Sequence, residues 1–258
     1  MRFGLEKYTL LALAVFSTTI SANTLATSGR PLAKTKLALL PPNVVTLSGG
    51  PTWRAIENSN ETFFLTPSIL KTYNPKDSID VIGNGELFIG SKVLSKKNVE
   101  GQIGLAAVYA ANANISGEIW DDGDPRFNNY TYKYKINHTH LALKGKLVAN
   151  KFDYFMPWAS ASIGYGFNNA KQYYSKPIIC EAVPTPEFQN RTWVDFAYVI
   201  GAGFESKVAE KWHLGIGYEF SDWGASKLGA ALDQTSSSGL TLDHLYTNGL
   251  IFSITYTD

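Results

Sequence analysis

Residues 212–220 read WHLGIGYEF, and residues 250–256 near the end of the chain read LIFSITY. In both stretches large apolar side chains occupy every second position. Glycine, hydroxyl-bearing and charged residues take most of the positions between them. An alternation with a period of two predicts a β-strand whose two faces meet different surroundings. We therefore expect two strands here, each with one bulky apolar face and one face of small or polar residues.

The same alternation recurs along the chain and predicts six further strands, at 44–53, 85–94, 103–109, 132–148, 159–167 and 194–205. Eight strands satisfy the rule that a barrel with both ends on one side of a membrane has an even number. The apolar patch at 62–70 leaves two possibilities open, a further strand or part of the first long connection. Pro67 argues against a central strand there.

The connections between the expected strands alternate in length, with long ones around 54–82, 116–129, 171–191 and 221–241. Outer-membrane barrels have short periplasmic turns and long outer loops, whereas a soluble sandwich has no reason to separate loop lengths in this way. Tryptophan also prefers the membrane interface. All six tryptophans fall near expected strand ends, and we predict that they form an interface girdle: Trp53, Trp120, Trp158, Trp193, Trp212 and Trp223.

The start of the chain has the features of a secretory signal. Arg2 and Lys7 precede the short apolar run 9–16, and small residues permit cleavage after Ala22 or Ala26. We expect a signal peptide at 1–26, a linker at 27–42 and the barrel at 43–258. The net charge of +1 gives no basic field for nucleic acid, and the single Cys180 excludes an internal disulfide.

Charged side chains gather on the small, polar strand faces, which in a transmembrane barrel point inward. The predicted lumen-lining network consists of Glu86, Lys92, His138, His140, Lys144, Lys146, Asp195, Glu205 and Glu219. The interior of an eight-stranded barrel is just wide enough for side chains to fill, so opposite charges there should pair and plug it. The alternative is a narrow, gated path lined by the same groups.

Spacing argues against catalytic or metal chemistry. His138 and His140 share a strand face, but no third ligand joins them at a set spacing, so we predict no metal and no cofactor. His244 and the hydroxyl of Thr247 are three residues apart and would face opposite sides of a strand. The chain is therefore not expected to be an enzyme.

The glycine-aromatic strands GYGF (164–167), GAGF (201–204) and GIGYEF (215–220), with the terminal LIFSITY, resemble the outer-membrane β-barrels of opacity-type surface antigens and OmpA-type transmembrane domains. Residues 119–122 (IWDD) and 137–140 (NHTH) are similar to segments of porin-family proteins. The resemblance covers residue 44 to the C-terminus. It implies an architecture in the outer membrane of a Gram-negative bacterium, not a chemistry.

We accordingly expect an all-β, eight-stranded antiparallel up-and-down transmembrane barrel with long extracellular loops. Its function would be that of a surface protein that meets the lipid bilayer, lipopolysaccharide and host or envelope partners through those loops. The aromatic residues Trp120, Phe127, Tyr173 and Tyr174 are expected to be exposed there. The alternative function is a small channel or porin for ions or small apolar solutes.

Overall fold

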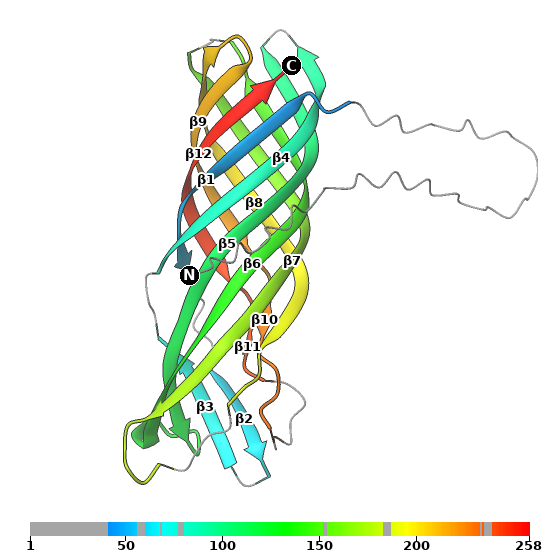
Figure 1. Cartoon of the computed structure of the whole chain (residues 1–258). Coiled ribbons are helices and arrows are strands. Elements are labelled where there is room, and N and C mark those ends of the chain that lie inside the picture. Colours follow the sequence, from blue (N-terminus) through cyan, green and yellow to red (C-terminus); the bar gives the residue numbers. More distant parts are fainter. Residues whose placement is uncertain are drawn as a thin grey trace, which may run out of the picture. The chain divides into compact units, whose positions relative to one another are not determined.

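The computed structural model describes residues 41–55, 60–67, 69–76, 80–96, 98–151, 154–182, 187–232, 234 and 239–258. The predicted signal peptide (1–26) and the linker as far as residue 40 lie outside the described residues. The barrel strands are β1 (Val44–Ala55), β4 (Val81–Lys96), β5 (Val99–Asp121), β6 (Asn128–Ala149), β7 (Met156–Pro177), β8 (Arg191–Ala209), β9 (Trp212–Asp222) and β12 (Tyr246–Thr257) (Figure 1).

These eight strands form one antiparallel ring. Neighbours in the sheet follow the order β5-β4-β1-β12-β9-β8-β7-β6, and the pairing of β5 with β6 closes it. The last strand lies beside the first, with Val44 opposite Thr257. A closed ring leaves no free edge among the barrel strands, and this is the condition for a sheet to cross a membrane. The predicted eight-stranded up-and-down barrel is confirmed.

The two faces of the ring are those that the alternation predicted. Leu214, Ile216 and Tyr218 on β9 are 46–49% exposed, whereas Glu219 on the opposite face is 7% exposed. Phe252 of β12 lies across from Ile216 on the outward surface. Large apolar side chains on the outside and charge on the inside are the arrangement of a barrel surrounded by lipid. Among the described residues, no helix is long and apolar enough to span a bilayer.

The connections at one end of the barrel are short, and β1 begins and β12 ends at this short-turn end (Figure 1). At the other end, called the long-loop end below, the sheet continues beyond the ring. Strands β2 (Glu61–Thr66) and β3 (Ile69–Pro75) pair with each other, and β3 pairs with the outer end of β5. The patch 62–70 thus belongs to two strands outside the ring, within the first long connection. Pro67 lies at the turn between them.

One predicted loop is instead strand. The segment 116–129 was expected as a long connection, but β5 runs to Asp121 and β6 starts at Asn128, so that only 122–127 joins them, including the 3-10 helix η1 (Pro125–Phe127). The two strands pair as far as Trp120 opposite Asn128. Because β3 pairs with β5 here, this end of the hairpin is held on both edges.

Two irregularities change which side chains point inward at the long-loop end. The β5–β6 register shifts between Ala110 and Ala113, after which Ile115 and Ile119 are buried. On β7, Gln172 has a φ of 57°, and Tyr173 beyond it is 7% exposed. An extra residue in a strand reverses its faces, so the expectation that Tyr173 is exposed is wrong.

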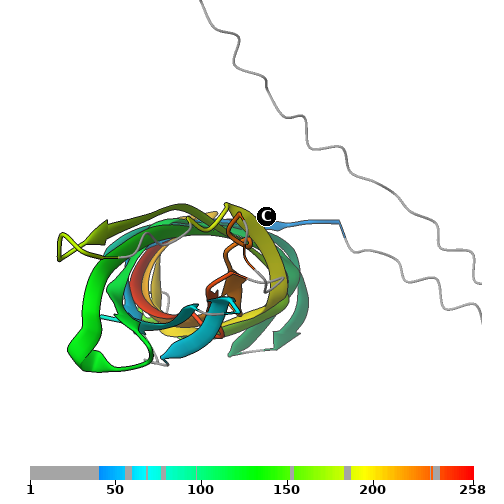
Figure 2. The ribbon, with the colours of Figure 1, turned by 90° about the horizontal axis from the view of Figure 1, so that it is seen from below.

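The connection between β9 and β12 folds back into the mouth of the ring. It contains the short strands β10 (Ser226–Lys227) and β11 (Thr241–Leu242), which pair with each other. In Figure 2 the orange segment that carries β10 lies within the outline of the barrel strands. Leu228 and Leu245 of this connection have no exposed surface. The described part of this expected loop is therefore packed, rather than free in solvent.

Candidate functional site in the barrel interior and at the long-loop end

The centre of the barrel holds an ion-paired cluster contributed by three strands. Lys144 of β6 donates from Nζ to Glu86 Oε1 of β4 at 2.5 Å and to Glu219 Oε1 of β9 at 3.4 Å. All three side chains are at most 8% exposed. Lys144 and Glu219 are 75 positions apart in sequence, and they meet because inward positions of non-adjacent strands face one another across a narrow barrel.

A second pair lies one step nearer the short-turn end. Lys146 Nζ contacts Glu205 Oε2 at 2.5 Å, and it also lies 5.2 Å from the centre of the Trp158 ring. Gly203 and Gly217 make room for this indole, since a Cβ at either position would come within 2.8 Å of its Cζ2 atom. The glycine-rich inner faces thus allow one large aromatic residue to fill the lumen.

Very little open space remains around these pairs. Lys144, Lys146, Trp158 and Phe88 line a cavity with a volume of about 20 Å³. A cavity of this size holds roughly one water molecule. The barrel interior at this level is therefore filled by side chains.

His138 occupies the next level toward the long-loop end. Its ring stacks on Trp223 with centroids 4.6 Å apart, and its Nδ1 lies 2.7 Å from Asn168 Oδ1. The amide nitrogen of Asn168 donates to the carbonyls of Trp223 and Ala225. Asn168 Oδ1 must therefore accept from His138, which places the histidine proton on Nδ1. This set of contacts fixes the β9–β12 connection against the barrel wall.

Among the described residues, no third metal ligand lies beside the buried His138 and His140. Their rings are 5.8 Å apart, and neither Nε2 has a described hydrogen-bond partner. Within the described part of the chain, no three His, Cys, Asp or Glu side chains are placed to hold a metal ion.

Two members of the predicted network lie apart from the others. Lys92 is at the short-turn end, 3.9 Å from Glu100 and 3.5 Å from the carbonyl of Asp258. Asp195 accepts from the backbone N–H of Ala225 at 2.8 Å. It therefore holds the β9–β12 connection instead of meeting a lysine. The structure thus joins Glu86, Lys144 and Glu219 in one contact set, pairs Lys146 with Glu205, and places His138 and His140 beside each other in the interior.

The tryptophan prediction is wrong at two positions. Trp158 and Trp223 are 6% and 4% exposed and lie inside the ring, against Lys146 and His138 respectively. Trp158 occupies an inward position of β7, where Gly203 and Gly217 leave space for its indole. Trp223 directly follows the end of β9 and packs inward against His138, a contact that the sequence pattern did not reveal. An interface role for Trp53, Trp120, Trp193 and Trp212 stays a prediction. Trp212 is 43% exposed and packs edge-on against Tyr256.

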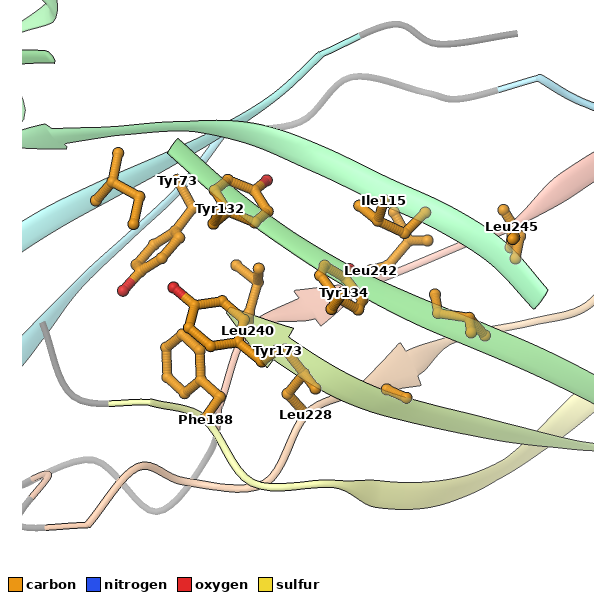
Figure 3. Packing of buried hydrophobic residues seen from close by; sticks show 14 of the residues in the cluster. Tyr73, Ile115, Tyr132, Tyr134, Tyr173, Phe188, Leu228, Leu240, Leu242 and Leu245 are labelled. Atoms are coloured by element: carbon orange, nitrogen blue, oxygen red, sulfur yellow. The ribbon is translucent and has the colours of Figure 1, made fainter. Parts of the chain in front are cut away.

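A second filled region closes the long-loop end, and sequence reasoning missed it (Figure 3). We call it the outer cluster. Tyr132 packs against Tyr73 of β3 and Tyr173 of β7, with ring centroids 5.5 and 6.3 Å apart. Phe188 and the leucines of the β9–β12 connection complete it. The labelled members are Tyr73, Ile115, Tyr132, Tyr134, Tyr173, Phe188, Leu228, Leu240, Leu242 and Leu245.

One carboxylate joins the first and last long connections next to this cluster. The backbone N–H of Thr241 donates to Glu61 Oε2 at 2.6 Å. Burial raises the pKa of Glu61 to about 7, although the hydrogen bond from Thr241 opposes the shift. Glu61 was not among the predicted site residues, because nothing in its local sequence places it beside a residue 180 positions away.

His244 has a hydrogen-bond partner that the spacing of residues in the sequence did not indicate. Its Nδ1 lies 3.0 Å from Asp222 Oδ2, between the ends of β9 and β12. The hydroxyl-bearing Thr247 of β12 is 1% exposed, whereas the side chain of His244, which precedes that strand, is 49% exposed. The histidine thus lies at the surface and Thr247 in the interior.

No family model matches the sequence, and no curated protein matches it. Solved structures to which it is similar include the outer membrane protease OmpT from Escherichia coli, with 11% identity, a TM-score of 0.47, and coverage of 87% of this chain and 99% of that one. Another is the outer membrane protein OprG from Pseudomonas aeruginosa, with 10% identity, a TM-score of 0.47 and coverage of 84% and 97%. Neisserial surface protein A has 7% identity, a TM-score of 0.42 and coverage of 83% and 96%. Each of these likenesses is one of fold alone.

Proposed function

We propose that this chain is an outer-membrane surface protein whose barrel is a closed scaffold and whose long-loop end meets partners in the envelope or on a host. The observation that carries the proposal is the filled interior. Ion pairs fill the middle of the barrel, and the outer cluster fills the long-loop end. A scaffold that is plugged at both levels leaves its outer surface as the place for recognition.

The contacts among the described segments of the long-loop end support this role. Strands β2 and β3 extend the sheet, and the β9–β12 connection is fixed by His138, Asn168 and Glu61. A surface held in one conformation loses less entropy on binding than a set of free loops. Phe127 and Tyr174, which are 50% and 55% exposed, are apolar anchors on this surface.

The alternative function is a small channel, in which the ion pairs would part to admit a solute. The test is single-channel recording of the refolded chain in a planar bilayer, with insertion verified by protease protection. A folded, inserted protein without stable openings is the expected result. Stable, voltage-dependent openings would overturn the closed-scaffold proposal and favour the channel.

A further inference from the structure

Four lysines lie on the outward side of β6 and β7 at the long-loop end. Lys135 and Lys171 are directly opposite each other across the two strands. Lys133 lies two residues from Lys135 on β6, toward the long-loop end, and is exposed. Lys176 of β7 lies opposite Thr131 and is also exposed. Like charges directly opposite each other on one sheet face are unfavourable. The position of these four lysines therefore indicates a surface that is stabilised by an anionic ligand.

Ion pairs with described carboxylates do not account for this group, although Asp80 lies near Lys133 and Lys135. None of the four lysines forms an ion pair with a carboxylate of the described residues, whereas nearby Glu118 is already paired with Lys76 at 2.6 Å. Asp80 is also near, and it accepts from the backbone N–H of Asn114 at 3.0 Å.

The level of the lysines relative to the lipid-facing surface suggests what the anion is. On the outward face of β7, Ile163, Tyr165 and Phe167 are 38–67% exposed, and Asn169 and Lys171 follow. Phe167 and Lys171 are four residues apart, or roughly 13 Å along a strand and about 10 Å along the axis of a tilted barrel. Lys171 and the facing Lys135 therefore lie just beyond the apolar band, at the level of lipid headgroups, and Lys133 and Lys176 lie farther out along the same two strands.

A hollow beside the lysines provides room for a headgroup. Lys133, Lys135 and Gln172 line a cavity of about 360 Å³, together with Asp80 and Asn114. Ligand pockets of this size hold a small molecule or a part of a larger one. Ammonium groups and an amide are donors for phosphate oxygens and sugar hydroxyls.

We propose that Lys133, Lys135, Lys171 and Lys176 bind the phosphate groups of an outer-leaflet glycolipid. The proposal deepens the proposed function, because it names one envelope partner of the long-loop end. A glycolipid is favoured over a soluble sulfated glycan because all four lysines lie on the outward side of the barrel and the Lys135–Lys171 pair lies immediately beyond the apolar band.

The test measures binding of bis-phosphorylated lipid A to the refolded chain in phosphatidylcholine nanodiscs, with dephosphorylated lipid A for comparison. A basic residue near an anionic membrane surface contributes about 1 kcal/mol, so Lys135→Gln with Lys171→Gln should weaken binding about thirtyfold. Lys207→Gln, an exposed lysine at the opposite end, should leave it unchanged. Each variant is first checked for folding by its resistance to protease.

Equal affinity for phosphorylated and dephosphorylated lipid A would overturn the proposal, and so would wild-type affinity in the double variant. Binding of heparin through the same lysines without binding of lipid A would assign the surface to a sulfated glycan instead. The recordings in planar bilayers separate the two proposals. A conducting barrel that prefers phosphorylated lipid A refutes the closed scaffold alone. A barrel that does not conduct and binds both forms of lipid A equally refutes this inference alone.

Discussion

Replacing Lys144 by methionine tests whether the central ion pairs hold the barrel closed. The substitution keeps a long side chain but removes the one cation that contacts both Glu86 and Glu219. The two carboxylates contact one nitrogen, so their oxygens are at most about 6 Å apart. Without Lys144 they would face each other in a space that holds about one water molecule.

The magnitude follows from the contact distances. At an effective dielectric constant near 20, the contacts at 2.5 and 3.4 Å correspond to attractions of about 7 and about 5 kcal/mol. Removing the lysine also recovers its desolvation cost of several kcal/mol, and breaking a buried pair on one side typically costs about 3–5 kcal/mol overall. We expect Lys144→Met to lower the free energy of unfolding by that amount.

The assay is urea unfolding of the refolded protein in detergent micelles, followed by tryptophan fluorescence. A loss of this size should move the midpoint down by about 1–2 M urea. Adding Glu86→Gln and Glu219→Gln should recover most of the loss, because no unpaired charge then remains buried. The matched control is Lys92→Met, whose lysine is 26% exposed and should contribute less than about 1 kcal/mol. A Lys144→Met protein as stable as this control would refute the reasoning.

Two further predictions concern the lipid-facing surface and the long-loop end. Ile216→Lys should destabilise the barrel by about 2–4 kcal/mol near the bilayer midplane, because Ile216 is 48% exposed on the outward face; unchanged folding into lipid vesicles would contradict that assignment. The raised pKa of Glu61, about 7 against the usual 4.5, means that its contribution to loop packing is full below pH 4.5 and is lost as the pH rises through 7. Hydrogen exchange of residues 239–245, corrected for its intrinsic pH dependence, should therefore be faster at pH 8 than at pH 5, and Glu61→Gln should remove the difference. Equal protection at both pH values in the unchanged protein would rule out this role.

Period-two alternation was sufficient to predict the barrel because each strand carries its two environments locally. The exposed Ile216 and the buried Glu219 follow directly from that pattern. The same reasoning placed Glu86, Lys144 and Glu219 on the inward face without showing that they meet, because contacts across a barrel depend on the stagger of non-adjacent strands. It also placed Trp158 at an interface, since a strand-end position does not reveal the glycines opposite it.

The amino-acid sequence by itself determined the strand number, the outward apolar face and the inward placement of the charges, since each rests on side chains that alternate within a single strand. Only the tertiary structure decided how the long-loop end is built. The register shift after Ala110 reverses the faces of β5. Gln172, which has a positive φ, marks the reversal of the faces of β7, and this buries Tyr173. The packing of Leu245 and the contact of Glu61 with Thr241 join segments that are far apart in the chain. Such contacts depend on how distant segments meet in the folded barrel, so no local pattern records them.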